Sequence, residues 1–424
     1  MKKAFSTPTA VLLWLAVLTA PPAAAQTAEE KLQAKARAIH EQAFTVDSHE
    51  DTPSEHLVKP GFDLTQDHGG KEEGQVDLPK MKRGGLDAAF WVVFVGQGPR
   101  NPAGYAAVRQ EAQAQFDAIA AALKKHPTEL ALATTPAEAL RIRKAGPRAV
   151  FIGIENGYTI GQDLGLLQTY YNQGARYLTL CHSSNNDLCD SSTDPNGPEY
   201  QGLSALGRQA VQEMNRLGIV VDISHTSDST VYDVLKLSRV PVIASHSASR
   251  ALSNVPRNLT DDLVRALAKK GGVVQLNLFS PYVKSQVKTA ERLAAEQALF
   301  AKYRIKTYLN AYALPPAEKQ AAFADYAQLE VQYPVPLATV QDAANQLDHL
   351  VQVAGIDHVG IGSDFDGGTV LTGLAHVGDF PNLTLELVRR GYSARDINKI
   401  WSGNLFRVMQ AVERGKGKTP VVRP

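Results

Sequence analysis

Residues 213–228 read EMNRLGIVVDISHTSD, which is the end of a helix-like segment, a glycine, a short apolar run and the polar pair Ser224-His225. The helix-like segment covers residues 205–217, and the apolar run covers residues 219–223. A short run of β-branched residues that ends in turn or polar residues predicts a buried strand. We therefore predict a helix that leads into a buried strand, with a serine and a histidine where that strand ends.

Seven further apolar segments of this kind occur along the chain, and helix-like stretches such as residues 104–125, 229–238 and 260–270 lie between most of them. Strands that alternate with helices predict a parallel sheet. Near-continuous apolar strands, buried on both faces, favour a closed barrel over an open sheet. The sequence thus predicts an α/β fold, a (β/α)8 TIM barrel, with strands at residues 43–47, 88–95, 149–154, 177–180, 219–223, 241–245, 272–278 and 358–362.

One segment does not fit this repeat. Residues 281–340, between the seventh and eighth predicted strands, are longer than one crossover needs and are rich in Ala, Glu, Lys and Gln. They predict a helical insertion, and long insertions on barrels often form a lid or an oligomer contact. We predict a single (β/α)8 domain over residues 26–424, in which a charged amphipathic helix at about residues 27–43 precedes the first strand.

The first 25 residues have the parts of a secretory signal peptide. Lys2 and Lys3 precede an apolar run at residues 10–20, which is too short to span a bilayer, and residues 23–25 offer a small-residue cleavage site. We expect an exported, soluble protein that is periplasmic or secreted and has no membrane anchor. The formal net charge is +1, and no basic stripe suggests a nucleic-acid partner.

The chain has two cysteines, Cys181 and Cys189. In an oxidising compartment they could form a short-loop disulfide, and the alternative is two free thiols. We favour the disulfide because free thiols are a liability in an exported protein.

Histidines and carboxylates gather where the predicted strands end, and four of the eleven histidines follow strands directly. In a barrel these ends meet at one face and carry the active site. Imidazole with carboxylate suits zinc, manganese or iron, and the ligand-capable side chains at these strand ends outnumber the four that one tetrahedral zinc needs. Alone, each residue has a plainer interpretation, such as a helix cap at Asp51 or a core histidine at His225 or His246. Their coincidence at the strand ends predicts a metal-dependent active site, and the side chains that it brings there include His49, Asp51, Glu155, His182, His225, His246 and Asp364.

At these residues the chain resembles the membrane (renal-type) dipeptidase family of metal-dependent amidohydrolase barrels. The similar stretches are DSHEDTP from residue 47, GIENG, ARYLTLCHSSNND, EMNRLGIVVDISHTSD, PVIASHSASRALSNVPRNLTDD and AGIDHVGIGSDFDG, and the resemblance runs from there to GNLFRV at residues 403–408. It implies a zinc dipeptidase, a metallopeptidase and hydrolase that forms a homodimer.

The resemblance also implies a role for each site residue. His49, Asp51 and Glu155 would hold one Zn²⁺, while Glu155, His225 and His246 would hold a second, so that Glu155 and a water or hydroxide bridge the two ions. His182 would approach the developing oxyanion, and Asp364 would serve the bridging hydroxide as the catalytic acid–base. Arg257 and Tyr282 would bind the carboxylate of a small dipeptide substrate.

Some features depart from the family pattern. The position of Glu50 is often Asn or Asp in the family, and the loops after the first two strands differ here. The cysteines do not reproduce the disulfide pattern of the cell-surface members. Two alternatives therefore stay open: hydrolysis of another small amide, such as an acyl amino acid, a lactam or a cyclic amide, and a non-catalytic zinc-binding or solute-binding protein.

Overall fold

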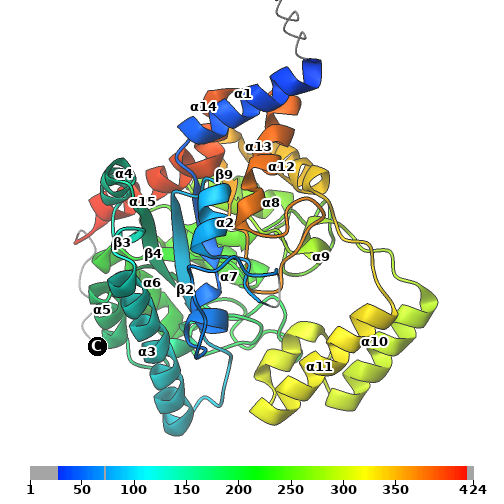
Figure 1. Ribbon diagram of the computed structural model, residues 1–424. Coiled ribbons are helices and arrows are strands. Elements are labelled where there is room, and N and C mark those ends of the chain that lie inside the picture. Colours follow the sequence, from blue (N-terminus) through cyan, green and yellow to red (C-terminus); the bar gives the residue numbers. More distant parts are fainter. Residues whose placement is uncertain (1–26, 71–72, 418–424) are drawn as a thin grey trace, which may run out of the picture.

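The core of the computed structural model, which describes residues 27–70 and 73–417, is a parallel barrel surrounded by helices (Figure 1). Eight strands pair in the order β1-β2-β4-β5-β6-β7-β8-β9. The ring closes where the Asp51 amide donates to the Phe365 carbonyl at 2.9 Å and the Asp364 amide donates to the His49 carbonyl at 3.0 Å. The (β/α)8 prediction is confirmed. The barrel strands are β1 (Val46–Glu50), β2 (Ala88–Phe94), β4 (Arg148–Glu155), β5 (Ala175–Thr179), β6 (Val220–Asp222), β7 (Ile243–Ser247), β8 (Val273–Leu276) and β9 (Val359–Ile361).

Two strand predictions need correction. The strand predicted at residues 43–47 lies at Val46–Glu50, because pairing with β2 begins at Val46 and continues into buried polar residues. The strand predicted at residues 241–245 lies at Ile243–Ser247, because its pairing with β8 begins at Ile243 and continues to the buried polar residue Ser247. A short strand that the sequence did not predict, β3 (Leu130–Leu132), pairs with β4 outside the eight-strand ring.

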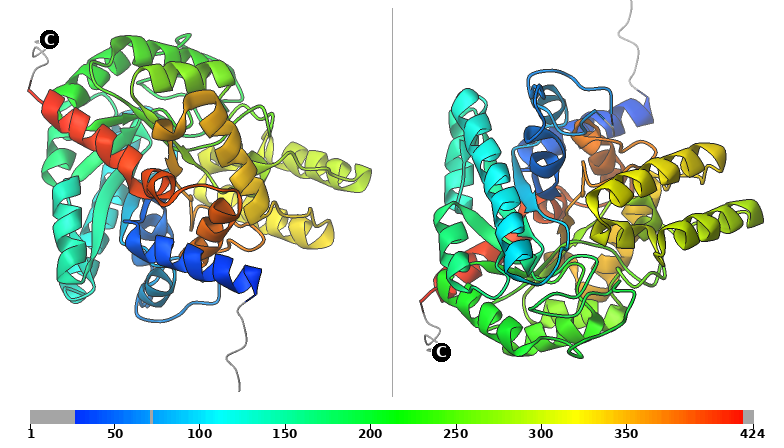
Figure 2. Two further views of the ribbon diagram at one scale, coloured as in Figure 1. Left: turned by 90° about the horizontal axis from the view of Figure 1, so that it is seen from above. Right: turned by 90° about the horizontal axis from the view of Figure 1, so that it is seen from below.

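Helices cover the outside of the ring and one of its ends (Figure 2). The helix predicted at residues 205–217 has those bounds because Ser204 caps its first turn and Gly218, at φ 84°, ends it in the left-handed conformation that glycine adopts without strain. The main helices around the ring are α1 (Ala28–Gln42), α2 (Leu78–Arg83), α3 (Pro102–Lys125), α4 (Pro136–Ala145), α5 (Gly165–Asn172), α6 (Ala205–Leu217), α7 (Asp228–Leu237), α8 (Asp261–Lys269), α12 (Val340–Ala354), α13 (Phe380–Arg389), α14 (Ala394–Asn398) and α15 (Asn404–Gly415).

Aromatic side chains fill the barrel below the ends of the strands that carry the site. The ring of Phe90 lies 4.8 Å from Phe151 and 5.1 Å from Tyr177. Phe406 of α15 packs beneath them and contacts Phe44 and Phe151. This packed interior fixes the strands, so residues at their carboxyl ends are held on a rigid frame.

The helical insertion projects from the barrel as a hairpin (Figures 1 and 2). It comprises α9 (Ser280–Val283), α10 (Ala290–Tyr303), a 3-10 turn (Tyr308–Ala313) and α11 (Pro316–Gln332). Leu299, Tyr303, Ala311, Ala322 and Leu329 form a small hydrophobic core of its own. The prediction of extra helices between the last two strands is confirmed.

The two cysteines do not form the expected disulfide: both are buried free thiols. The thiol of Cys181 instead points to the main-chain carbonyl of Asp190, at 3.7 Å. The predicted signal peptide lies outside the described residues. Within residues 27–70 and 73–417, none of the helices combines the length and the apolar character that a bilayer crossing requires.

Candidate metal centre

The predicted ligands come together at the carboxyl ends of four strands. His49 and Asp51 come from the end of β1, Glu155 from the last position of β4, His225 from the turn after β6, and His246 from β7. All five are buried. The register of β1 against β2 shifts between Asp47 and Glu50, and that of β7 against β8 shifts between Ala244 and Ser247, so each shift spans a histidine of the site. Such irregularities re-aim side chains and are common next to active sites.

The carboxylate of Glu155 faces a different set of side chains with each of its oxygens. Oε2 lies 3.6 Å from Nε2 of His49, which is itself 3.7 Å from Oδ1 of Asp51. Oε1 lies 2.9 Å from Nε2 of His225 and 3.2 Å from Nε2 of His246. Two atoms that each lie about 2.0–2.1 Å from a tetrahedral zinc are roughly 3.3 Å apart. The spacing therefore suits two cations, one on each side of Glu155.

Unsatisfied polar atoms support the same interpretation. His49 Nε2, Asp51 Oδ1 and Glu155 Oε1 are buried and form no hydrogen bond within the described part of the chain. The 2.9 Å contact of Glu155 Oε1 with His225 is an ion-pair contact without hydrogen-bond geometry. Buried polar atoms are normally paired, and leaving them unpaired costs free energy. A divalent cation in each set would satisfy them, so the residues present fit a two-metal centre.

Two histidines are oriented by hydrogen bonds to Nδ1, the ring nitrogen that faces away from the centre. The hydroxyl of Tyr177 donates to the Ser48 carbonyl and lies 2.9 Å from Nδ1 of His49. The hydroxyl of Ser245 donates to Asp222 at 2.6 Å and lies 2.8 Å from Nδ1 of His246. In both cases Nδ1 then carries the proton, and Nε2 presents its lone pair to the centre.

Tyr177, Asp222 and Ser245 are therefore positioning residues that the sequence analysis missed. One available signal was the carboxylate of Asp222 inside an otherwise apolar strand. A charged side chain is rarely buried in such a run without a partner.

Neighbouring side chains set the protonation states of Glu155 and His49. Burial opposes the ionised form of Glu155, but His49, His225 and His182 hold its pKa well below the usual value. Burial also opposes the proton on His49, yet Glu155 and Asp51 raise the pKa of that imidazole well above 6.5. Glu155 is thus an anion at neutral pH, and without metal a proton on His49 partly compensates it.

His182 and Asp364 lie beside the ligands. The ring of His182 is 4.3 Å from that of His225, and burial, together with the charges of Arg257 and His49, lowers the pKa of His182 to about 4. Asp364 follows β9 in the left-handed conformation, at φ 64°, and its carboxylate accepts a hydrogen bond of 2.9 Å from Asn277. Burial and the nearby Asp51 raise its pKa well above the usual value. At neutral pH His182 is uncharged, and Asp364 is disposed to bind a proton.

Arg257 is buried but has no carboxylate within ion-pair distance in the described ranges. Its guanidinium donates to the Ser247 hydroxyl at 2.9 Å and to the His246 carbonyl at 2.8 Å, and its Nε forms no hydrogen bond. The Tyr282 ring lies 5.7 Å from the guanidinium carbon. A buried cation without a counter-ion is costly, which favours an anionic ligand for Arg257.

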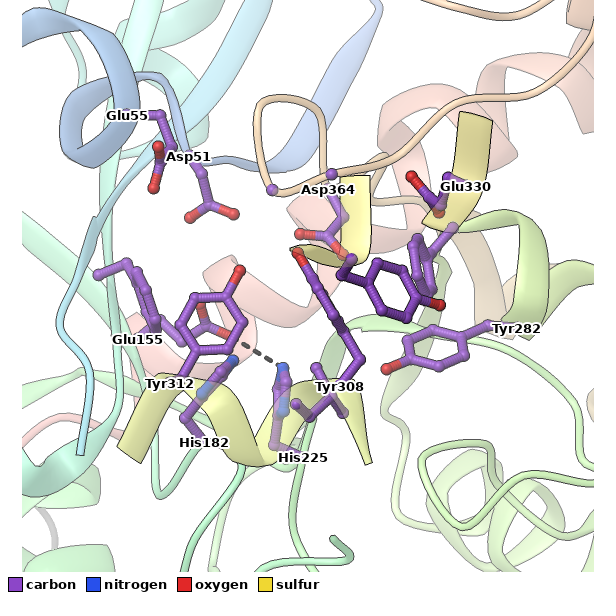
Figure 3. A pocket seen from close by; sticks show the side chains of 16 residues that line it. Asp51, Glu55, Glu155, His182, His225, Tyr282, Tyr308, Tyr312, Glu330 and Asp364 are labelled. Carbon is purple, nitrogen blue, oxygen red and sulfur yellow. Dashed lines mark ion pairs between the residues drawn. The ribbon is translucent and has the colours of Figure 1, made fainter. Parts of the chain in front are cut away.

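A pocket of about 750 Å³ opens from these residues toward the insertion (Figure 3). Asp51, Glu155, His182, His225 and Asp364 line its inner part, and Tyr282 lines one side. Tyr308, Tyr312, Tyr326 and Glu330 of the insertion line its outer part. The insertion therefore covers the candidate centre as the lid interpretation expects.

Comparison with known proteins agrees with this geometry. Residues 33–421 match the model of the membrane dipeptidase family, peptidase family M19. A dipeptidase of Aspergillus oryzae, aclJ, is 31% identical over 345 residues, which are 80% of this chain and 70% of that protein. A dipeptidase of Clonostachys rogersoniana, verJ, is 32% identical over 346 residues, which are 80% of this chain and 76% of the relative.

A solved structure extends the similarity to three dimensions. The probable dipeptidase PvdM from Pseudomonas aeruginosa is 29% identical and superposes with a TM-score of 0.80 over 91% of this chain and 99% of that one. A family match over most of the chain, with relatives above 30% identity, is more specific than a shared barrel, which hosts many activities. The chain therefore belongs to the membrane dipeptidase family, peptidase family M19.

Proposed function

We propose that the protein is a two-zinc dipeptidase that hydrolyses the peptide bond of free dipeptides. The observation that carries the proposal is the position of Glu155, whose two carboxylate oxygens face two separate ligand sets. His49 and Asp51 would hold one ion, and His225 and His246 the other, with Glu155 shared. When bound, two such ions lower the pKa of a shared water and polarise the substrate carbonyl.

The side chains around this centre suit the remaining steps. Asp364, with its raised pKa, is suited to accept a proton from the attacking water and to pass it to the leaving amine. The imidazole of His182 is suited to donate a hydrogen bond to the carbonyl oxygen as negative charge develops there, and such donors typically contribute about 10²- to 10³-fold in rate. Both groups line the same pocket.

The length of the substrate follows from Arg257. Its guanidinium, with Tyr282 beside it, would hold the free carboxylate of the second residue close to the metal centre. A guanidinium pairs with carboxylates through two parallel hydrogen bonds. A longer peptide has no carboxylate at that position, and the unpaired cation would then be left buried.

The test is metal analysis of the purified protein combined with a dipeptide panel. The panel contains free-acid and C-amidated dipeptides, N-acyl amino acids and dipeptides with a D-residue in the second position. We expect two zinc ions per chain and turnover confined to the free-acid dipeptides. Turnover of the amidated or N-acyl compounds alone would instead favour another small amide as the substrate, and metal binding without any turnover would favour a binding protein.

The proposal includes location and assembly. We expect the first 25 residues to act as a signal peptide that directs export to the periplasm or the medium, and we expect a homodimer. The mass of the exported chain and its sedimentation behaviour check these expectations.

A further inference from the structure

The inner turn of the insertion is packed onto the candidate active site. The Tyr312 ring lies 5.3 Å from His182 and 5.7 Å from Phe94, edge to face in both cases. Asn310 donates to the Thr193 carbonyl at 3.1 Å, which ties the turn to the segment after β5. The side chains of the insertion therefore have a defined position over the pocket.

Those side chains give the outer pocket an aromatic and anionic lining. Tyr308, Tyr312 and Tyr326 contribute rings, and the Tyr308 and Tyr326 rings are 4.5 Å apart. Glu55 and Glu330 contribute carboxylates, and the described residues that line the outer part of the pocket include no lysine or arginine. The hydroxyl of Tyr312 has no hydrogen-bond partner within the described ranges, and Glu55, Asp51 and Asp364 all act on it electrostatically. Aromatic faces and carboxylates together attract organic cations.

The two carboxylates are not equivalent. Glu55 lies 3.7 Å from the ammonium group of Lys59, which partly neutralises it. Glu330, in the last turns of α11, forms no ion pair with any lysine, arginine or histidine of the described residues. Glu330, which is exposed, is therefore the outer carboxylate that has no ion-pair partner among the described residues.

The position of Glu330 indicates which part of a dipeptide it would meet. Figure 3 shows Glu330 and Tyr282 on one side of Asp364, with Glu55 on the other. Glu330 also shares a neighbouring cavity of about 730 Å³ with Phe279, whose ring lies 4.8 Å from Tyr282, and with Arg292, whose charge is paired with Glu296 at 2.7 Å. Tyr282 and Arg257 mark the end that would receive the substrate carboxylate, so Glu330 lies on the side of the second residue.

We propose that Glu330 is a specificity-determining residue that selects dipeptides with a cationic side chain on the second residue. The inference rests on the proposed function. The ammonium or guanidinium group of such a residue would reach Glu330 past the Tyr308 ring, while its carboxylate pairs with Arg257. The Tyr326 ring already has the guanidinium of Arg292 over it, at 5.4 Å. An ion pair at an exposed position contributes modestly, and we expect about a fivefold preference.

The experiment compares matched dipeptides on the zinc-loaded, full-length mature protein. Ala-Lys is compared with Ala-norleucine, which has nearly the same shape without the charge, and Lys-Ala is compared with norleucine-Ala. We expect kcat/KM for Ala-Lys to exceed that for Ala-norleucine by about fivefold at low salt, with a smaller ratio at high salt. The Lys-Ala pair should show no such ratio.

Substitutions in α11 test whether Glu330 is the residue that causes the preference. Glu330→Gln should bring kcat/KM for Ala-Lys down to that for Ala-norleucine, and Glu330→Lys should invert the preference between the two dipeptides. Glu318→Gln, in α11 but paired with Arg304 at 2.9 Å and outside the pocket, should keep the wild-type ratio.

Each of the following outcomes would contradict the inference. Equal turnover of Ala-Lys and Ala-norleucine by the wild type overturns the cation preference, and a preference that survives in Glu330→Gln overturns the role of this residue. A preference confined to the Lys-Ala pair overturns the placement at the second residue. Failure to hydrolyse any dipeptide overturns the proposed function as well, whereas hydrolysis of all four at equal rates overturns only the inference.

Discussion

The hydroxyl of Tyr177 lies 2.9 Å from Nδ1 of His49, and this contact leaves Nε2 of the same ring to face Asp51 and Glu155. Tyr177 stands on the packed interior of the barrel, against Phe90. The contact therefore connects the rigid core to the candidate metal centre. Hydrogen bonds behind a metal ligand fix the tautomer and orientation of its ring.

Replacing Tyr177 by Phe should weaken metal binding without unfolding the barrel. The change removes the hydrogen bond to His49 and keeps the ring volume, so we expect metal affinity to fall about 10- to 100-fold. Competition with a chromophoric chelator measures this. Tyr170→Phe is the matched control, because its hydroxyl donates to the Thr159 carbonyl, outside the site. Equal affinities in wild type and Tyr177→Phe would show that Tyr177 does not position His49.

Replacing Asp364 by Asn should remove turnover and leave both metals bound. An amide cannot shuttle a proton, and loss of an acid–base group typically costs about 10²- to 10⁴-fold in rate. Steady-state kinetics and metal analysis on the same preparation check both parts. Near-normal kcat in a fully loaded variant would remove Asp364 from the proton transfer.

Replacing Arg257 should weaken the interaction of the enzyme with the free carboxylate of the substrate. We expect Arg257→Ala to lower kcat/KM for free-acid dipeptides about 100-fold, because a buried charge pair is lost. Arg257→Lys should recover only part of this, since lysine has no planar fork. Because Arg257 also donates to the His246 carbonyl, metal content is measured alongside. Unchanged free-acid turnover would assign Arg257 a purely structural role.

His40 predicts a pH dependence of stability far from the metal centre. Its Nε2 lies 2.8 Å from the Gly84 carbonyl and its Nδ1 lies 2.7 Å from the Thr384 hydroxyl, which also accepts from Trp401. In the neutral ring Nε2 donates to the Gly84 carbonyl, and Nδ1 then accepts the Thr384 hydroxyl proton. Burial lowers its pKa below 6.5, although the hydrogen bond to Gly84 acts in the opposite direction.

A lowered histidine pKa means that the unfolded chain binds more protons than the folded one as the pH falls through 6.5. The free energy of unfolding therefore decreases as the pH is lowered through that range. Thermal unfolding of metal-free wild type and His40→Gln at pH 7.5 and 5 checks this, because titration at the metal centre is common to both proteins and cancels. We expect Tm to fall more in the wild type. An equal fall in both proteins would mean that protonation of His40 does not oppose folding.

Local signals explain which elements could be predicted. The cap at Ser204 and the glycine at 218 lie next to the helix that they bound, and that helix was predicted with its observed ends. The strand β1 was placed too early because its second half, Ser48–His49–Glu50, is polar but buried. A strand is recognised in the sequence by its apolar residues, which are buried against the core. This signal is absent where the buried residues of the strand are polar and contact other residues of the site.

By itself, the sequence determined the alternation of strands and helices, the insertion, and the ligand-capable side chains at the strand ends, since these depend on neighbouring residues and on the rule that strand ends share one face. Only the tertiary structure decided how those side chains meet. The contacts of Glu155 with His49 and His246, and of Tyr177 with His49, join residues far apart in the chain. So does the placement of Glu330 over the pocket, because no local pattern sets how the hairpin of the insertion folds back onto the barrel. Such contacts depend on barrel closure and core packing, which act between distant segments and leave no local periodicity in the sequence.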